Sequence, residues 1–333
     1  MQSLNQKYRP RSWAEVVGQE AVTSILAKQV STHRWKNVYL FCGEWGSGKT
    51  TCARIFAREI NNGVGEPIEI DGASNNGVDN IRSIIADAYR SAIGSDYKTI
   101  IIDEAHQLSR AAWDAALKII EEPPTNTVFI FCTTAPEKLP NTILSRVQRF
   151  DFKKVPQSLI ADRLEFILQE ELHNQYERGA LERIATLANG HVRDAIQYLD
   201  KCLEVDDNIT LSLVETTLGL VKFENVFGML VAICKKNLPT YLALLGSLSS
   251  SNFDLVKVYE EILSVALDCA IYQATKEVRY IGIPSEKTDE IEALQGVTEA
   301  LDRFVYYRQF LSPNTAEALL KTIAVELCRG ESR

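Results

Sequence analysis

The segment Gly43-Glu44-Trp45-Gly46-Ser47-Gly48-Lys49-Thr50 decides the fold of the first part of this chain. It fits the pattern G-x-x-x-x-G-K-[ST] without a mismatch, and it lies between an apolar run and an amphipathic one. Glycines in such a loop let successive backbone N–H groups turn inward around phosphate oxygens, and the next helix adds a favourable dipole. We expect Lys49 to reach the β- and γ-phosphates of a nucleoside triphosphate and the Thr50 hydroxyl to bind Mg²⁺. An ordinary glycine-rich turn is the alternative, which the flanking patterns disfavour.

Strand and helix patterns alternate on both sides of this loop. Short apolar, β-branched runs predict strands, whereas apolar residues at helical spacing predict helices. This alternation implies a parallel sheet with helices on both faces, so residues 1–155 are predicted to form an α/β nucleotide-binding domain. The predicted strands are residues 37–42, 67–71, 99–103, 127–133 and 150–152, and the predicted helices are residues 49–61, 78–92 and 109–122.

The strand patterns stop near Pro156. Residues 156–207 are predicted to form a small helical lid, with helices at 158–171, 179–188 and 192–203. A polar run, Asp206-Asp207-Asn208, predicts a hinge after the lid. Beyond it, Leu, Val, Ile and Ala recur at helical spacing without any motif of catalytic chemistry. Residues 208–333 are therefore predicted to form an all-helical scaffold domain.

Composition and charge exclude several classes of protein. The 333 residues have a net charge of −8, which argues against a protein that coats DNA by bulk electrostatics, although a local basic patch stays open. No apolar run reaches the roughly 18 residues that a membrane span needs, so no membrane association is expected. The seven cysteines are scattered and none lies in a Cys-x-x-Cys pair, so neither a zinc knuckle nor a disulfide framework is indicated. A start without a signal-peptide pattern fits a cytoplasmic location.

Two carboxylates, Asp103 and Glu104, end a predicted buried strand. Ligands collect at the carboxyl ends of strands in open parallel sheets. There Asp103 would hold Mg²⁺ through water, and Glu104 would orient and polarise the attacking water. The alternative is a solvated strand end followed by a helix cap. With a complete phosphate loop upstream, the adjacent pair favours NTP hydrolysis over the chemistry of a small-molecule kinase, which needs an acceptor site.

Three further polar residues follow in the chain. Thr134 closes the next predicted strand, where a hydroxyl could bond the γ-phosphate or the attacking water; a strand-terminal turn is the alternative. Arg146 follows a turn with two prolines, and Arg193 opens a predicted lid helix. A guanidinium is planar, permanently charged and able to bind phosphate through two donors. From composition alone, a surface salt bridge is the favoured interpretation of either arginine.

Taken together, these residues resemble a family, the AAA+ ATPases, and within it the gamma/tau subunits of bacterial DNA polymerase III, which are ATP-hydrolysing loaders of sliding clamps. The combined pattern covers about the first 200 residues in the order of that family and is far more specific than any single motif. The stretches that carry it are residues 7–10, 16–20, 43–50, 68–74, 102–106, 117–124, 133–134 with 138–140, 143–146 and 190–195.

The resemblance implies a role for each matched residue. ATP and Mg²⁺ are the implied ligands, with Tyr8, Arg9 and Val17 at the adenine and Asp103 and Glu104 as the metal-supporting and water-activating pair. Thr134 is the implied sensor at the γ-phosphate. Arg146 is the implied arginine finger, acting in trans on a neighbour's ATP, and Arg193 the second sensor, acting in cis. The implied contacts of the phosphate loop are Gly43, Gly46, Ser47, Gly48, Lys49, Thr50 and Thr51.

The resemblance also implies partners: other loader subunits in a pentameric ring, a sliding clamp and primer–template DNA, with the helical third domain in a collar. Loaders bind DNA mainly by its backbone. The N-terminus of a helix with Asn or Ser donors can bind a phosphate group, so DNA contacts are predicted at such helix N-termini. Helix capping explains each of these residues equally well. The candidates are Asn75, Asn76, Arg82, Ser109 and Arg110, with Lys118 as a weaker link between DNA and Glu104.

Two departures from the family pattern are visible. The four-cysteine zinc module that usually follows the phosphate-loop helix is replaced by residues 61–66, so no zinc is expected, and Val147 stands where the family usually has cysteine. The missing zinc module suggests a divergent branch, such as a viral or compacted loader. The long tail of the tau form, which binds polymerase or helicase, is not expected, since the sequence ends near Arg333. A scaffold subunit of the same assembly, or another AAA+ DNA-remodelling ATPase such as a branch-migration helicase, is the alternative function.

Overall fold

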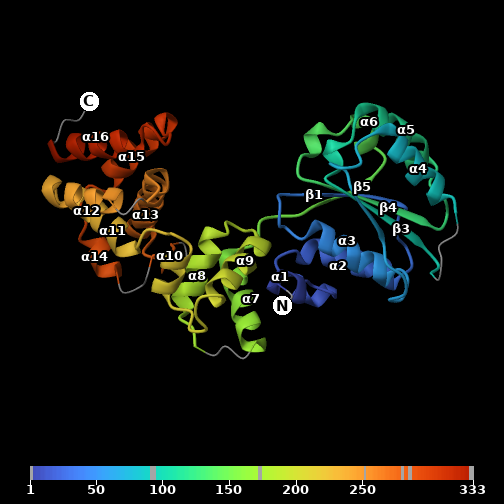
Figure 1. Ribbon diagram of the computed structural model, residues 1–333, viewed down its shortest axis with the longest axis horizontal. Helices are drawn as coiled ribbons and strands as arrows, with labels where there is room; N and C mark the ends of the chain where they lie inside the picture. Colours follow the sequence, from blue (N-terminus) through green and yellow to red (C-terminus); the bar gives the residue numbers. More distant parts are fainter. Residues whose placement is uncertain are drawn as a thin grey trace. The chain divides into compact units, whose positions relative to one another are not determined.

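The computed structural model describes residues 3–90, 95–171, 175–250, 253–278, 281–283 and 287–329. By compactness the chain divides into two units (Figure 1). Unit 1 is Met1–Asn174 with Ile184–Asp200, and unit 2 is Gln175–Arg183 with Lys201–Arg333. The boundary passes through α8 (Arg178–Leu187). The three-domain division expected from the sequence stays a prediction.

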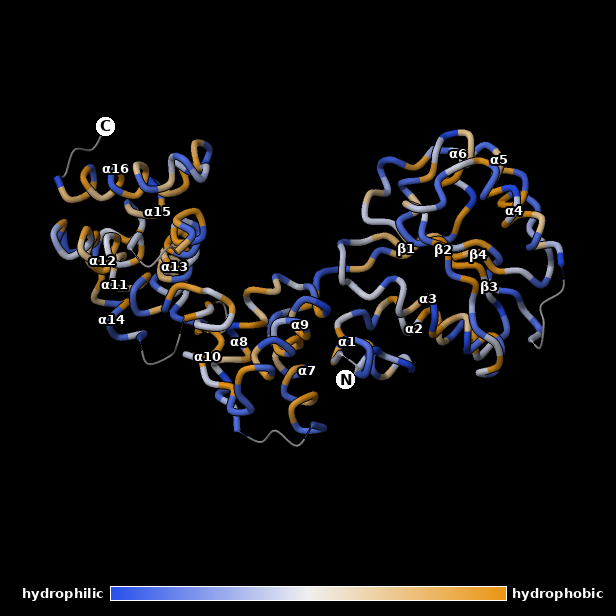
Figure 2. The backbone as a smooth tube through the Cα atoms, viewed as in Figure 1, coloured by the Kyte–Doolittle hydropathy of each residue, from blue (hydrophilic) through white to orange (hydrophobic). Residues whose placement is uncertain are grey.

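Among the described residues, five strands of unit 1 form one parallel sheet in the order β2-β3-β4-β1-β5. The predicted parallel sheet is confirmed. Its central strands are almost wholly buried, as expected for apolar runs covered on both faces, and Figure 2 shows them as hydrophobic. The strands are β1 (Val38–Cys42), β2 (Ile68–Asp71), β3 (Lys98–Asp103), β4 (Thr127–Thr133) and β5 (Gln148–Asp151).

Side chains alternate across β1 and divide the core into two layers. Tyr39 and Phe41 pack with buried residues of α2 (Glu20–Ser31) and α3 (Lys49–Glu59). Leu40 packs on the opposite face with α4 (Val78–Ala88) and α5 (Arg110–Glu121). Figure 1 shows these two helix pairs on opposite sides of the sheet. The expected helices on both faces are therefore present.

Several element boundaries differ from the predicted ones for identifiable reasons. β5 begins at Gln148 because that polar residue pairs with Tyr39 of β1, although no apolar pattern marks it. α3 ends at Glu59 rather than residue 61, since Asn62 takes a left-handed φ of 51° and the Asn61 amide turns to Tyr97, accepting from its N–H at 2.8 Å. α4 ends at Ala88, so the predicted helix is too long: residues 89–90 form a turn and a bend, and residues 91–92 lie outside the described residues.

α2 is not among the predicted helices, and its composition explains the omission. Val22 and Leu26 are buried, but Ile25 is 47% exposed, so the apolar residues do not follow one clean face. By contrast, α5 begins as predicted. The Ser109 hydroxyl accepts the backbone N–H of Ala112 at 3.2 Å, which is a helix N-cap.

The segments after the sheet are helical, as predicted. In unit 1 these are α7 (Gln157–Glu170) and most of α9 (Val192–Leu203). Unit 2 has its own apolar core, in which Tyr259 donates its hydroxyl to the Phe304 carbonyl. None of the described helices is both long enough and apolar enough to span a membrane. The main helices of unit 2 are α10 (Leu211–Thr217), α11 (Phe223–Cys234), α12 (Leu238–Ser250), α13 (Leu255–Thr275), α14 (Thr288–Glu292), α15 (Val297–Tyr307) and α16 (Ala316–Arg329).

Candidate nucleotide-binding site

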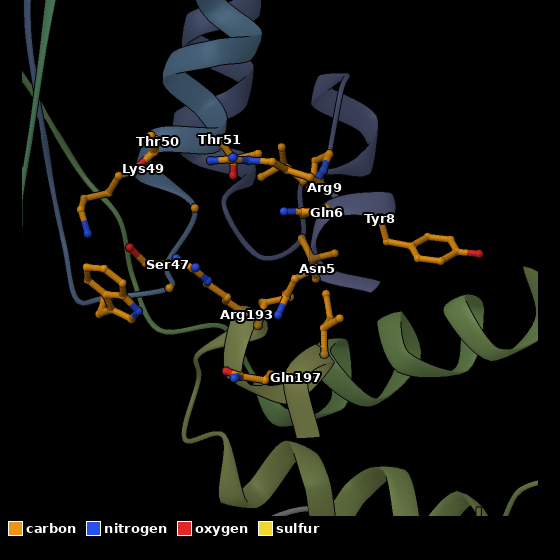
Figure 3. Close-up of a pocket in the computed structure, with 18 of the residues that line it drawn as sticks. Asn5, Gln6, Tyr8, Arg9, Ser47, Lys49, Thr50, Thr51, Arg193 and Gln197 are labelled. Carbon is orange, nitrogen blue, oxygen red and sulfur yellow. The ribbon is translucent and has the colours of Figure 1, made fainter. Parts of the chain in front are cut away.

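A cavity of about 520 Å³ lies in unit 1 between the phosphate loop, the carboxyl end of β3, the N-terminal segment and α9 (Figure 3). Its size suits a small-molecule ligand. It brings together residues that lie far apart in the sequence. Of the predicted site residues, those lining it are Tyr8, Arg9, Val17, Gly46, Ser47, Gly48, Lys49, Thr50, Thr51, Asp103, Glu104 and Arg193; Gly43, Thr134 and Arg146 do not.

The phosphate loop has a backbone that only glycine tolerates at key points. Gly48 has a φ of 99° immediately before the first residue of α3, a conformation that a side chain disfavours. At Gly43, an added Cβ would lie 2.6 Å from the carbonyl oxygen of Phe152. The Ser47 hydroxyl donates to the Glu44 carbonyl at 2.8 Å and closes the loop on itself. The sequence between β1 and α3 therefore builds a tight turn that leads into a helix N-terminus.

Lys49 is a buried cation inside this loop, with only 5% of the residue exposed. Its Nζ donates to the carbonyl oxygens of Gly43 at 2.9 Å and Glu44 at 2.8 Å. Burial lowers the pKa of Lys49, and the nearby carboxylates of Asp103 and Glu104 act in the opposite direction. An ammonium has three N–H donors, so after these two bonds one donor remains for a phosphate oxygen.

Thr50 and Asp103 meet across the cavity although 53 positions separate them in the chain. The Thr50 hydroxyl donates to Asp103 Oδ2 at 2.6 Å, and the backbone N–H of Glu104 donates to Asp103 Oδ1 at 2.9 Å. A hydroxyl and a carboxylate side by side form the oxygen-only ligand set that Mg²⁺ prefers. The two residues predicted to support the metal therefore fit that ion.

Glu104 has a strained backbone, with a φ of 48° in the left-handed region. The turn after β2 packs directly against it, because an added Cβ on Gly72 would lie 2.9 Å from the Glu104 carbonyl oxygen. The Glu104 carboxylate lies beside β4: its Oε2 is 3.5 Å from the Thr134 hydroxyl. Thr134 thus contacts Glu104 from an adjoining cavity of about 460 Å³.

Two side chains of the phosphate loop contact the segment that begins α9. The guanidinium of Arg193 lies 5.6 Å from the centroid of the Trp45 ring, a cation–π contact. Glu44 Oε2 lies 3.1 Å from His191 Nε2 and 3.2 Å from Lys154 Nζ. Hydrogen bonds from His191 and Lys154 hold the pKa of Glu44 below its ordinary value. Sequence reasoning gave Trp45 no role and missed the Glu44–His191 pair, because the partners lie in different predicted domains.

The remaining wall of the cavity comes from the N-terminal segment. Arg163 Nη2 donates to the Tyr8 carbonyl at 2.9 Å, and the Leu4 N–H reaches Asp200 Oδ2 at 3.4 Å. Burial and the charges of Arg54 and Arg193 lower the pKa of Arg9. In Figure 3 the Tyr8 ring points away from the phosphate loop, and its hydroxyl is hydrogen-bonded to Glu171.

Gln19 is a positioning residue that sequence reasoning passed over. It is 4% exposed, and its Nε2 donates to the carbonyl oxygens of Ser47 at 3.2 Å and Lys153 at 2.7 Å. These bonds tie the phosphate loop to the segment that follows β5. Its place in the 16–20 stretch was the available signal, but a buried amide is recognised only once its partners are known.

Known proteins resemble this chain in sequence along most of its length. The family model for the DNA polymerase III delta subunit matches residues 66–156. The chain is 33% identical to DNA polymerase III subunit tau of Bacillus subtilis over 97% of its own length and 58% of that protein. It is 33% identical to subunit tau of Escherichia coli over 82% of its own length and 46% of that protein.

The chain is a homologue of the gamma/tau subunits of DNA polymerase III.

This gamma/tau homologue spans about half the length of the curated relatives it matches. Among solved structures, the Thermotoga maritima RuvB Holliday junction branch migration motor has a TM-score of 0.54 at 22% identity, over 83% of this chain and 99% of that one. At that identity the likeness shows the fold alone, which is the AAA+ fold predicted from the sequence. In the part of the chain that the structure describes, no group of three or more His, Cys, Asp or Glu side chains is arranged to hold a metal ion.

Arg146 does not line the nucleotide-binding cavity of its own chain. It follows α6 (Asn141–Leu144), and its side chain is 39% exposed. Its Nε lies 2.7 Å from Glu121 Oε1, and its Nη1 donates to the Thr142 carbonyl at 2.7 Å. The guanidinium is therefore held at the surface, where a group outside this chain can reach it.

Four of the predicted DNA contacts, Asn75, Asn76, Ser109 and Arg110, lie at two adjoining turns, since the Ser109 N–H donates to the Asn76 carbonyl at 3.1 Å, and Arg82 lies in α4. Several of their side chains already have intramolecular partners. The Asn75 amide donates to the Asp71 carbonyl at 3.0 Å, and Arg82 pairs with Asp79 at 3.2 Å. Together with the Ser109 cap, these bonds support the capping alternative. Asn76 and Arg110 are exposed on the same pair of turns.

Proposed function

We propose that this chain is the ATP-hydrolysing motor subunit of a DNA polymerase sliding-clamp loader. The observation that carries the proposal is the meeting of Thr50 and Asp103 at 2.6 Å, in one cavity with Lys49 and Glu104. This is a complete set of groups for binding a nucleoside triphosphate with Mg²⁺ and for hydrolysing it. Homology to gamma/tau subunits supports the link to the clamp loader.

Each residue of the set has a distinct task. Backbone N–H groups of the phosphate loop and the Lys49 ammonium bind the phosphates, while Tyr8, Arg9 and Val17 enclose the adenine end. Thr50 and Asp103 would hold Mg²⁺, which would supply positive charge to neutralise the phosphates. Glu104 accepts a hydrogen bond from the attacking water and directs its lone pair at the γ-phosphorus.

Three further groups act at the γ-phosphate. Thr134, whose hydroxyl lies 3.5 Å from Glu104 Oε2, turns its O–H to the γ-phosphate when ATP is bound. Arg193 acts in cis from α9, after exchanging its Trp45 contact for a phosphate oxygen. Arg146 acts in trans on the ATP of a neighbouring subunit, which its exposed position outside its own cavity supports. A guanidinium at this position contributes on the order of 10³-fold or more to the rate.

In the proposed assembly this chain occupies a pentameric ring with other loader subunits in the cytoplasm. ATP binding opens the clamp and places it on primer–template DNA, and hydrolysis releases it. Backbone contacts through the turns that carry Asn76 and Arg110 suit binding without sequence preference. A scaffold subunit is less well supported, because the four residues Lys49, Thr50, Asp103 and Glu104 are all in place.

The proposal is tested by measuring ATP turnover of the chain mixed with candidate loader subunits, clamp and primed DNA, omitting each component in turn. We expect turnover to rise only with the complete mixture and to disappear with Glu104→Gln, which still binds ATP. Stimulation by DNA alone, without dependence on any clamp, would instead favour another AAA+ DNA-remodelling ATPase.

A further inference from the structure

His106 contacts the carboxylate that is proposed to activate water. Its Nδ1 lies 3.3 Å from Glu104 Oε2 and 3.1 Å from the Thr133 hydroxyl. The same Oε2 lies 3.5 Å from the Thr134 hydroxyl. In the described residues no hydrogen bond is made to the other carboxylate oxygen, Oε1. Donors therefore gather on one oxygen of Glu104 and leave the other to accept.

The neighbours of the imidazole favour one tautomer. A carboxylate oxygen can only accept, so the contact with Glu104 is favourable when Nδ1 carries its single hydrogen, which Glu104 Oε2 at 3.3 Å then shares with the Thr133 hydroxyl oxygen at 3.1 Å. On the opposite side of the ring, Gln107 Nε2 lies 3.1 Å from His106 Nε2. With Nδ1 protonated, Nε2 has a lone pair that accepts from the Gln107 amide, so one neutral tautomer satisfies both contacts.

The imidazole is also fixed in place. It belongs to the short 3-10 helix η2 (Ala105–Gln107), which begins directly after the strained Glu104, and its side chain is 8% exposed. Thr133, the last residue of β4, is fully buried, and its hydroxyl also accepts the Ala135 N–H at 3.1 Å. His106 is thus anchored to the end of the sheet. Gln107, at the outer end of this chain of contacts, lines the adjoining cavity beside Glu104.

We propose that His106 is a positioning residue for ATP hydrolysis. Its Nδ1–H holds Oε2 of Glu104 against the end of β4, so that Oε1 faces the attacking water in one orientation. This inference rests on the proposed ATPase function and adds a residue to it. Misplacing a reacting group by about 1 Å can lower a rate on the order of 100-fold, so an orienting contact of this kind has a measurable effect.

Two nearly isosteric substitutions separate the orienting hydrogen bond from simple packing. The amide N–H of asparagine occupies the position of Nδ1, whereas that of glutamine occupies the position of Nε2. We expect His106→Asn to keep kcat within about 3-fold and His106→Gln to lower it by about 10- to 100-fold. The Kd for ATP stays within about 2-fold for both, because neither nitrogen lines the main cavity.

The measurement is single-turnover hydrolysis at saturating ATP, in the subunit mixture that gives the unmodified chain its highest rate, with thermal unfolding recorded for each variant. Equal rates for His106→Gln and the unmodified chain, or equally low rates for both substitutions in folded proteins, overturn the inference. If either variant is unfolded, the same kcat measurement on Thr133→Val tests the inference instead. This substitution removes the anchor of the imidazole, and an unchanged kcat overturns the inference.

Glu104→Gln, measured in parallel, distinguishes failure of the proposed catalytic site from failure of the proposed role of His106. If it hydrolyses ATP at the unmodified rate, the proposed catalytic site itself is wrong. If it is inactive while His106→Gln is fully active, only the role of His106 is wrong.

Discussion

The carboxyl edge of the sheet in unit 1 and the apolar core of unit 2 follow opposite rules. At the sheet edge, Glu104 has a left-handed backbone and Lys49 is a buried cation whose pKa is lowered by burial. In unit 2, the core is formed by apolar side chains, and its buried hydroxyls have partners. Tyr241 donates to the Leu320 carbonyl at 3.1 Å, and Tyr259 to Phe304.

The difference shows that the residues of the proposed functional site destabilise the folded state locally. A strained backbone and a buried charge each destabilise the folded state, and they persist where the surrounding structure over-determines them. Unit 2 also buries a carboxylate, that of Glu215, whose pKa is raised by burial and which accepts the Phe223 N–H at 3.1 Å, but this group lies outside the apolar core cluster, which obeys ordinary packing rules. Substitutions at the sheet edge should therefore change turnover, and substitutions in the core of unit 2 should change stability.

The largest effect is expected for Lys49→Ala. Removing the buried ammonium deletes the charge that binds the phosphates, so turnover should fall by at least about 10³-fold. The folded state should not lose stability, since a desolvated charge is removed. Turnover in the assembled complex and the Kd for ATP measure the change. Lys321→Ala, an exposed lysine of unit 2, is the matched control, and a wild-type rate for Lys49→Ala would rule out the site.

The next effect tests a surface residue that acts on another chain. Arg146→Ala should lower turnover of the complex by about 10³-fold while leaving the Kd for ATP nearly unchanged. Mixing this variant with Lys49→Ala should restore part of the activity, because one subunit then supplies the cavity and its neighbour the guanidinium. Arg146→Lys keeps the positive charge but lacks the planar guanidinium that binds phosphate through two donors, so it should recover only part of the rate. Normal turnover by Arg146→Ala contradicts the action in trans.

Phe304→Ala tests the other side of the comparison. This residue is fully buried in unit 2, and truncation should lower the free energy of unfolding by about 3 to 5 kcal/mol. The Kd for ATP at a temperature where the protein is folded should not change. Chemical denaturation measures the first quantity and nucleotide titration the second, with Phe304→Leu as the milder control. A weakened ATP affinity in the folded variant would show that the two regions are coupled.

The smallest effect is expected at the start of α5. Ser109→Ala removes an N-cap and should cost about 1 kcal/mol of unfolding free energy, whereas Ser109→Asn should retain most of it. If Ser109 also binds a DNA phosphate, the alanine variant should weaken binding to primed DNA by more than this change in stability explains. DNA titration with both variants distinguishes capping from DNA contact. Equal DNA affinity for the two variants would show that Ser109 caps the helix and does not contact DNA.

Much of unit 1 was predictable because its signals are local. The buried runs of β3 and β4, the cap at Ser109 and the phosphate loop are each written in a few consecutive residues. The beginning of β5 was not, since polar Gln148 joins the sheet only through its pairing with Tyr39. The helix α2 was missed because its apolar residues do not form one clean face.

By itself, the sequence determined a phosphate loop between a strand and a helix, an acidic pair at a strand end and a helical remainder, because contiguous residues set backbone conformation and burial. Only the tertiary structure decided that Thr50 meets Asp103, that Gln19 ties the loop to the segment after β5, and that His106 lies between Thr133 and Glu104. These contacts join residues from separate elements. Their distances depend on the order and twist of the strands, which no local pattern specifies.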